Sequence, residues 1–396
     1  MTKKTQLTGL NLFFLWFGAA VSVAEILTGG YLAELGWQRG IWAIVLGHLA
    51  GTLLLVLAGL IGFTQKTPAI ASTRISFGKN GSYLISVINI LQLVGWTAIM
   101  IIEGGAAMNA ITSSLFHLNE PLLMSALIGA LVGFWVFWGV KGFKMINTIA
   151  VALLFTLTVV MSWVVFSGEP AATDAIKPKG AFGMGFELSI IMPLSWFPLI
   201  SDYTSLAKSK KGALIAPFLG YFVGSCWMYM IGMAGGLFSG SADPTKVMLA
   251  ANLGLTAMAI FGLSTVTTTF LDVFSAGVSL TNIFPKVNER WAAVVFAVLG
   301  TGLALIFPME HYTNFLYLLG SVFSPLIAVL LTDYFFLKQD SRDKTFDGAA
   351  TASLIAGFVF YYLIKIYHLP VGATLTTIVF TAVMHVLIRK LLARRA

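Results

Sequence analysis

The chain has 396 residues, of which 58% are hydrophobic and only 10% are charged, and its mean hydropathy is +0.89. This composition excludes a soluble globular protein and predicts an integral membrane protein. The net charge of +8 comes from basic residues scattered over short loops, which argues against a nucleic-acid partner. The single cysteine, Cys226, excludes an intramolecular disulfide and a cysteine-based metal site.

Apolar segments follow one another along the whole chain. We expect twelve spans, centred near residues 21, 52, 95, 130, 155, 193, 224, 267, 300, 325, 357 and 380. Runs of about 18 to 26 apolar residues match the length that a helix needs to cross a bilayer, whereas barrel strands alternate over about 10 residues. The sequence therefore predicts an all-α membrane protein with twelve transmembrane helices. The N-terminus leads directly into span 1, so we expect no cleaved signal peptide.

Basic residues set the expected orientation. Most of the 24 lysines and arginines lie before span 1, after the even-numbered spans, or at the C-terminal end. The positive-inside rule then places both termini in the cytoplasm and the chain in the inner or plasma membrane. No segment is long and polar enough for a soluble domain, and no protein partner is evident. We therefore expect neither an enzyme nor a partner other than a small substrate, an ion and the lipid bilayer.

Two spans carry signals for an interrupted helix. Span 1 contains GAAVSVAE at residues 18–25, and span 6 contains Pro193 and Pro198, each of which removes a backbone donor. Glycine and proline are also common in membrane helices without a break. However, four spans separate these two, which is the spacing of a five-plus-five inverted repeat. We expect a first repeat over residues 9–167, a second over residues 181–337, and accessory spans over residues 348–392.

Acidic residues inside the spans are few, and they are Glu25, Glu103, Glu187 and Asp272. An acid at the bilayer centre costs at least roughly 2.5 to 3.5 kcal/mol, so such residues mark a polar cavity or an ion path by default. For Glu25 and Asp272 we favour a functional cavity over a structural hydrogen bond to unwound backbone. For Glu187, nearer the end of span 6, the structural interpretation is equally good.

Span 3 predicts a face for a flat ligand. Gln92, Trp96 and Glu103 recur at helical spacing. A tryptophan beside amide and carboxyl groups suits a heteroaromatic ring that stacks while its ring nitrogen and amino groups form hydrogen bonds. The alternative is that Trp96 only packs. The five histidines are dispersed without metal-ligand spacing, and we assign them no role.

Span 8 predicts an ion site. Ser264, Thr267 and Thr268 stand at positions i, i+3 and i+4, so their oxygens converge on one side of a helix. Hydroxyl and carbonyl oxygens are hard ligands that suit sodium. Hydroxyls in membrane helices also commonly bond to their own backbone, which is the competing interpretation.

Several short motifs recur in a characteristic order. They are TGG at 28–30, RISFGKNGS at 74–82, VGW at 94–96, SDY at 201–203, VTTT at 266–269 followed by FSAG at 274–277, and SPLIAVLLTDYF at 324–335. In this order they resemble the nucleobase:cation symporter-1 family, in particular its cytosine permease branch. Within that family the chain is most similar to the hydroxymethylpyrimidine transporters associated with thiamine precursor salvage.

The resemblance implies a broken-helix transporter of the leucine-transporter fold, which moves a pyrimidine-type base with a cation by alternating access. By motif, sodium would bind the backbone carbonyls of Gly18 and Val21 and the oxygens of Ser264, Thr267 and Thr268. Substrate residues would be Trp96 for stacking, Ser195 at the span 6 break, and Thr269 at a position where the family carries asparagine. No other cofactor is implied.

The departures from the family pattern fall in the expected pocket. The helix 3 glutamine is shifted to Gln92, Trp196 stands near an expected aromatic position that Pro193 occupies, and Glu25 and Asp272 replace uncharged residues. We therefore expect hydroxymethylpyrimidine rather than cytosine, with sodium as the coupling ion. A proton-coupled cytosine or purine-type permease is the alternative, and a channel is a further one.

Overall fold

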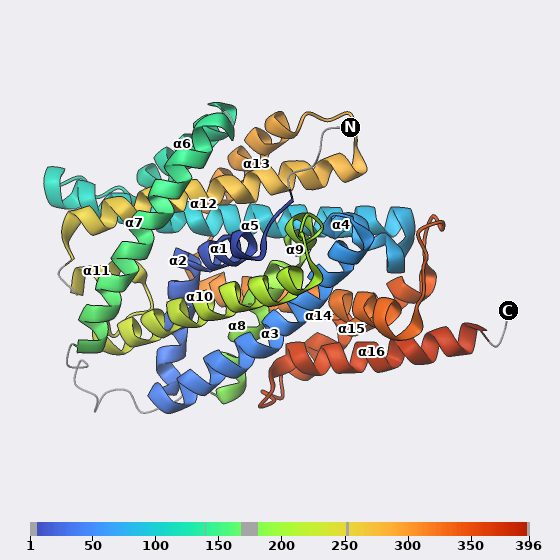
Figure 1. Cartoon of the computed structure of the whole chain (residues 1–396). Coiled ribbons are helices and arrows are strands. Elements are labelled where there is room, and N and C mark those ends of the chain that lie inside the picture. The colour runs from blue at the N-terminus through green and yellow to red at the C-terminus, as the bar shows by residue number, and fades with distance from the viewer. Residues whose placement is uncertain (1–5, 139, 168–180, 251–252, 394–396) are drawn as a thin grey trace.

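The computed structural model describes the backbone of residues 6–138, 140–167, 181–250 and 253–393. The side chains of residues 140–148, 150–151, 249–250, 267 and 393 lie outside this description. The chain is helical throughout the described part (Figure 1). The helices are α1 (Gly9–Ala20), α2 (Val23–Tyr31), η1 (Leu32–Leu35), α3 (Trp37–Gln65), α4 (Ala69–Ser72), α5 (Arg74–Phe116), α6 (Pro121–Trp138), α7 (Val140–Ser167), α8 (Phe182–Ser195), α9 (Phe197–Thr204), α10 (Lys210–Ser239), α11 (Pro244–Ala250), α12 (Gly254–Ile283), α13 (Glu289–Ala304), η3 (Met309–His311), α14 (Tyr312–Leu331), η4 (Thr332–Leu337), α15 (Gly348–Lys365) and α16 (Gly372–Ala393).

Eight of the described helices are long and apolar enough to cross a membrane, and there are ten spans if each of two bent helix pairs counts as one. Two further helices, α7 and α13, lie where we predicted the other two spans, centred near residues 155 and 300. In α7 the side chains are described without a gap only over Ala152–Ser167, and α13 has 16 residues. The all-helical, multi-pass membrane architecture is thus confirmed, while the count of twelve spans stays a prediction.

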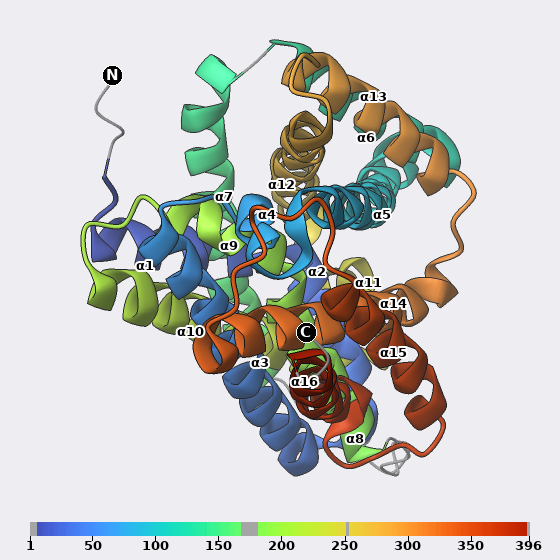
Figure 2. The ribbon, with the colours of Figure 1, turned by 90° about the vertical axis from the view of Figure 1, so that its right-hand side faces the viewer.

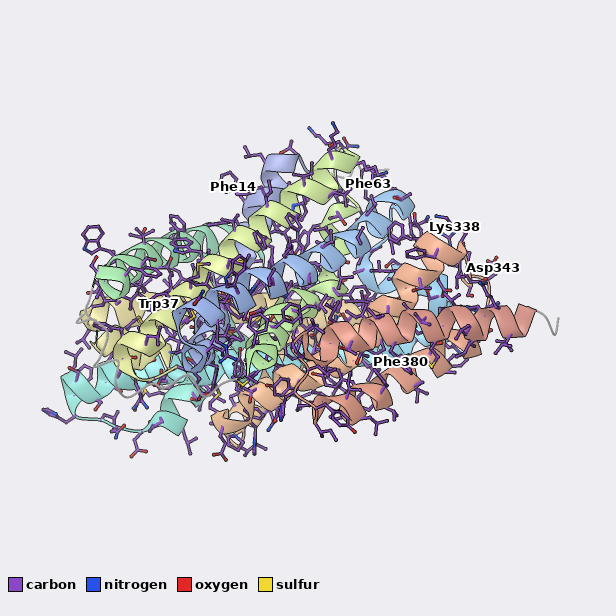
Figure 3. The ribbon with its side chains drawn as sticks, turned by 90° about the horizontal axis from the view of Figure 1, so that it is seen from below. Phe14, Trp37, Phe63, Lys338, Asp343 and Phe380 are labelled. Carbon is purple, nitrogen blue, oxygen red and sulfur yellow. The ribbon has the colours of Figure 1, made fainter. Side chains whose placement is uncertain are left out.

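The outer surface of the bundle is apolar along its length. Figure 3 shows Phe14 projecting from the flank of the bundle and Lys338 and Asp343 near one end. Phe14 is exposed, as are many other large apolar side chains. Apolar side chains around the flank and charged side chains at the end are the distribution expected of a protein surrounded by lipid.

Both predicted helix interruptions are present. The first lies at Val21 and Ser22, where α1 and α2 meet at an angle of 55°. Ser22 caps α2, because its hydroxyl accepts a hydrogen bond from the amide of Glu25 at 3.4 Å. The second lies at Trp196, where α8 and α9 meet at 43°. Pro198 occupies the first turn of α9, where the missing backbone donor costs nothing.

The helices form two packed groups. In one, α5, α6, α12 and α13 contact each other around a hydrophobic cluster of their own, and Figure 2 shows these four helices together on one side. In the other, α1, α2, α3, α8 and α10 pack around the larger cluster, with α14 and α16 against α8 and α15 against α14 and α16. The two broken helices thus belong to one group and the helices of spans 3 and 8 to the other.

Backbone contacts bring together segments that we expected on one side of the membrane. The Leu7 amide donates to the Leu206 carbonyl at 2.8 Å, and the Lys79 amide donates to the Lys344 carbonyl at 3.0 Å. Gly78 makes the second contact possible, because its φ is +75° and a Cβ there would lie 2.7 Å from the Lys344 carbonyl oxygen. The N-terminal segment therefore lies beside the loop after span 6, and the loop after span 2 beside that after span 10. That this side is cytoplasmic stays a prediction.

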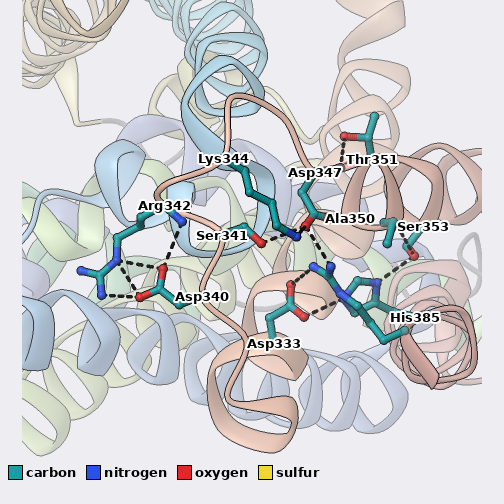
Figure 4. A network of polar contacts seen from close by, with 12 residues as sticks. Asp333, Asp340, Ser341, Arg342, Lys344, Asp347, Ala350, Thr351, Ser353 and His385 are labelled. Atoms are coloured by element: carbon teal, nitrogen blue, oxygen red, sulfur yellow. Dashed lines mark hydrogen bonds and ion pairs between the residues drawn. The ribbon is translucent and has the colours of Figure 1, made fainter. Parts of the chain in front are cut away.

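A buried polar network ties the accessory helices to the end of α14 (Figure 4). Asp333, in the π-helical turn η4, accepts hydrogen bonds from His385 Nε2 at 2.8 Å and from Arg389 Nη2 at 3.0 Å. Arg389 Nη1 also donates to Asp347 Oδ2 at 2.9 Å. Three separate elements are thereby held together by charged groups with good partners.

Asp347 lies in the loop before α15 and caps that helix. Burial by itself would raise the pKa of the Asp347 carboxyl, but hydrogen bonds from Arg389, the Ala350 amide, Ser341 and Lys344 outweigh it. The pKa therefore lies well below its ordinary value, and the carboxyl group stays ionised at neutral pH.

Candidate functional site

A cavity lies where the two helix breaks face α5 and α12. The cavity is narrow: its volume is about 40 Å³, which is room for a few water molecules. Its lining residues are Ser22, Ala24, Glu25, Gln92, Leu93, Trp96, Met100, Met192, Ser195, Trp196, Leu199, Thr268 and Asp272. Side chains from both helix groups therefore meet around one mostly apolar space.

The cavity gathers the predicted substrate residues with one exception. Glu25, Gln92, Trp96, Ser195, Trp196 and Asp272 all line it. Thr269 does not, although we predicted it as a substrate residue. It is fully buried, and its hydroxyl donates to the carbonyl of Thr265 at 2.6 Å. Thr268 and Asp272, four residues apart, present one face of α12 to the cavity, and Thr269 lies about 100° further round the helix.

Two tryptophans form the aromatic part of the wall. Trp96 makes edge contacts with Phe315 and Tyr312, with ring centroids 5.3 and 6.3 Å apart. Trp196 makes an edge contact with Trp16 at 5.9 Å. Such edge-to-face pairs are a favoured aromatic geometry and hold each ring in place. The cavity therefore has rigid aromatic surfaces on both helix groups.

Gln92 connects α5 to the break in span 6. Its Nε2 donates to Asn89 Oδ1 at 2.8 Å and to the carbonyl of Ser195, the last residue of α8, at 3.1 Å. The side chain is buried, and its Oε1 has no hydrogen-bond partner among the described residues. An unpaired buried carbonyl is costly. Gln92 thus lines the cavity with its amide nitrogen committed to the protein and its enclosed carbonyl oxygen still without a donor in the described part of the chain.

The two carboxyl groups in the wall differ in their surroundings. Glu25 is 1% exposed, and its two oxygens accept hydrogen bonds from Tyr221 at 2.7 Å and from Ser225 at 2.6 Å. Glu25 therefore links the break in span 1 to α10. The Asp272 side chain has no hydrogen-bond or ion-pair partner among the described residues. No lysine, arginine or histidine is among the residues that line the cavity.

The predicted sodium ligands are placed only in part. Val21 lies at the break in span 1, and the amide of Ser22 donates to the Ala20 carbonyl at 2.9 Å rather than to Gly18, as a continuous helix would require. Thr268 lines the cavity, and its hydroxyl donates to the Ser264 carbonyl at 2.9 Å.

The Thr267 side chain lies outside the described residues, so the sodium site stays a prediction. Within the described part, no group of three or more histidine, cysteine, aspartate or glutamate residues could hold a metal ion.

Some lining residues were not predicted. Met192 and Leu199 flank Trp196 at helical spacing, and Met100 follows Trp96 by one turn; the periodicity around each tryptophan was the signal that could have found them. Glu103 is buried without lining the cavity.

Glu187 serves the structural role that we had considered. It accepts hydrogen bonds from the Tyr361 hydroxyl at 2.6 Å and from the Thr374 hydroxyl at 2.7 Å. The first donor belongs to α15 and the second to α16, so Glu187 anchors both accessory helices to α8.

A central cavity at two interrupted helices in an all-helical membrane protein defines the class of broken-helix secondary transporters. Within that class, the sequence profile of the family described as permease for cytosine/purines, uracil, thiamine, allantoin matches residues 2–387. The chain belongs to this family. It is a membrane permease in the broad sense of the family's description, and not an enzyme.

Curated relatives carry several substrate names. The chain is 26% identical to the cytosine permease of Escherichia coli K12 over 330 residues, which cover 82% of this chain and 77% of that protein. It is 22% identical to the hydantoin permease of Microbacterium maritypicum over 364 residues, which cover 83% and 73% of the two chains.

Solved structures show the same fold. The inward-facing conformation of Mhp1 superposes with a TM-score of 0.83 at 19% identity, covering 99% of this chain and 93% of that one. The closed conformation of Mhp1 with bromovinylhydantoin bound, a nucleobase-cation-symport-1 family transporter, gives 0.81 at 18% identity and covers 99% and 94%. These similarities confirm the fold, while the substrate and the ion belong to the proposal that follows.

Proposed function

We propose that the chain imports a pyrimidine-type base, hydroxymethylpyrimidine in particular, together with sodium by alternating access. The observation that carries this proposal is the pairing of Trp96 with the unpartnered Oε1 of Gln92 in one cavity at the helix breaks. A stacking surface beside an unsatisfied acceptor suits a flat ring with an exocyclic donor.

Each wall residue has a role in this proposal. The base stacks on Trp96, with Trp196 on the side of the span 6 break. Stacking of a base on an aromatic side chain is worth about 1–3 kcal/mol. The Gln92 carbonyl accepts a hydrogen bond from the amino or hydroxymethyl group of the base. Ser195 and Asp272 are the further polar contacts, and Glu25 holds the span 1 break against α10 beside them.

Sodium would bind the carbonyls of Gly18 and Val21 and the oxygens of Ser264, Thr267 and Thr268. The changed hydrogen bonding at Ser22 supports an available carbonyl at this break. The Thr268 hydroxyl uses its hydrogen for a backbone carbonyl and keeps oxygen lone pairs for a cation. Hard neutral oxygens of this kind suit sodium.

One observation favours a second candidate, a proton-coupled cytosine or purine-type permease. Glu25 and Asp272 both line the cavity, and no basic side chain is among the lining residues. A carboxyl group in such surroundings is suited to carry a proton across the membrane. In that case the oxygens of span 8 are structural only.

Uptake into proteoliposomes distinguishes the candidates. Labelled hydroxymethylpyrimidine should accumulate with an inward sodium gradient at equal pH, and not with a pH gradient in sodium-free buffer. Thr268→Val should abolish the sodium dependence. Thr265→Val is the matched control, because that hydroxyl donates to the Phe261 carbonyl at 2.8 Å and does not line the cavity. Accumulation driven by the pH gradient alone would support the second candidate instead.

A further inference from the structure

Several polar hydrogens of the cavity wall are committed to the protein itself. Both Nε2 hydrogens of Gln92 have acceptors, one of them the Ser195 carbonyl. The Ser195 hydroxyl donates to the Met192 carbonyl at 2.7 Å, and the Thr268 hydroxyl donates to the Ser264 carbonyl at 2.9 Å. The donors left for a ligand are the Ser22 hydroxyl and the indole N–H groups of Trp96 and Trp196, which donate to no acceptor among the described residues.

Two acceptor groups of the wall also lack a hydrogen-bond partner within the described part of the chain. Gln92 Oε1 has no partner, and the Asp272 carboxyl group has none among the described residues. Glu25 differs, because each of its oxygens already accepts one hydrogen bond from α10. The cavity therefore offers free donors as well as free acceptors, and Asp272 is the acidic group among the acceptors that have no partner in the described part of the chain.

Asp272 needs a hydrogen-bond donor from the ligand more than Gln92 does, because it is acidic and no basic side chain is among the residues that line the cavity. A carboxylate is best satisfied by two parallel N–H donors that carry positive charge. An aminopyrimidine presents this arrangement when the ring nitrogen next to its amino group holds a proton, since the two nitrogens then form an amidinium edge. A ring with an oxo group at that position would instead direct a carbonyl oxygen towards the carboxylate.

We propose that Asp272 is a specificity-determining residue that binds the amino-amidine edge of an aminopyrimidine and rejects rings with an oxo group at that position. The inference rests on the proposed function and names its substrate class. In the complex the ring nitrogen holds the proton and the carboxyl group is ionised, so the pair is neutral overall. A base that arrives neutral takes this proton from the Asp272 carboxyl group, where an O–H bond breaks as the N–H bond forms. Gln92 Oε1 accepts the second donor of the ligand, its hydroxyl group.

The test compares two ligands on two proteins. The ligands are hydroxymethylpyrimidine and the pyrimidinone in which an oxo group replaces its amino group, and binding to the purified protein is followed by tryptophan fluorescence. We expect the wild-type protein to prefer the amino compound by about 100-fold. In Asp272→Asn this preference should fall below about 10-fold, chiefly because the amino compound binds more weakly. Thr269→Val, on the same helix but away from the cavity, should keep the preference.

The outcomes are separable. Equal binding of the two compounds to the wild-type protein would overturn the inference, and this comparison needs no variant that must fold. The inference is also overturned if Asp272→Asn weakens the binding of both compounds by the same factor, so that the preference for the amino compound is unchanged. If the wild-type protein binds hydroxymethylpyrimidine while the inference about Asp272 fails in one of these two ways, the proposed function stands. If it binds no pyrimidine at all, the proposed function fails and the inference with it.

Discussion

Replacing Gln92 with leucine tests the cavity wall at a single residue of similar volume. The variant removes the hydrogen bonds to Asn89 and to the Ser195 carbonyl, each worth about 0.5–1.5 kcal/mol net. Loss of the unpartnered Oε1 offsets part of this cost. The free energy of unfolding without ligand should therefore fall by about 1–3 kcal/mol at most, and thermal unfolding in detergent would measure it.

Ligand binding should suffer more specifically. A donor of the base loses its acceptor and remains buried, which costs about 1–3 kcal/mol, or roughly 5- to 150-fold in Kd. Titration of hydroxymethylpyrimidine measures this change. Thr97→Val is the matched control, because it removes one buried hydroxyl from the same helix that donates to the Leu93 carbonyl and does not line the cavity. If Gln92→Leu bound the base within twofold of the wild-type protein, the site as described would be wrong.

Three further changes have defined outcomes. Gly29→Ala should destabilise the protein by about 1–3 kcal/mol, because a Cβ there would lie 2.3 Å from the Tyr229 carbonyl oxygen. Gly133→Ala is the control and should not destabilise it, because a Cβ at that position has nothing within 4 Å. The same thermal stability for both variants would contradict the packing of α2 on α10. The pKa of Asp347 is lowered from 3.8, so the ionised carboxyl group stabilises the fold above pH 3.8, and this stabilisation is lost as the pH falls through the lowered pKa. Asp347→Asn should therefore reduce the dependence of stability on pH between 3.8 and the lowered pKa. An unchanged acid unfolding curve would refute the role of the network of Asp333, Asp347, His385 and Arg389. Glu25→Gln should weaken pyrimidine transport, since an amide cannot accept hydrogen bonds from both hydroxyls of α10 in the same way; unchanged affinity and pH dependence of uptake would remove Glu25 from both binding and coupling.

Local signals in the sequence predicted the parts of the site that depend on helical geometry. Pro193 and Pro198 marked the break in span 6, and the actual break at Trp196 lies between them. Gln92 and Trp96 share a helix face, and the structure places both in the cavity. Thr269 was predicted from a resemblance of position alone, and the structure places it one residue beyond Thr268 on α12, outside the residues that line the cavity; its role stays a prediction.

Tertiary partners could not be predicted in this way. The TGG motif entered only as part of the family resemblance, and the structure shows that Gly29 serves close packing, because it lies against Tyr229 some 200 residues away in the chain. The SDY motif is similar, since Ser201 donates to the Ala58 carbonyl at 3.1 Å and Asp202 accepts from the Ala69 amide at 2.8 Å. No local pattern names the helix on the other side of such a contact.

The partners of Glu25 show where a signal existed. Tyr221 and Ser225 are four residues apart, so they present two hydroxyls from one face of α10. That spacing could have suggested a pair of donors for an intramembrane acid. Which acid they serve depends on how the break in span 1 packs on α10, and only the folded structure provides that.

The central claim is tested most directly by thermal stabilisation of the purified protein with hydroxymethylpyrimidine, cytosine, uracil, thiamine and hydantoins, each with and without sodium. A ligand that binds the folded state must raise its apparent stability. We predict a sodium-dependent increase in Tm with hydroxymethylpyrimidine, larger than with any other compound. An increase with cytosine instead, or one that is the same without sodium, would contradict the account.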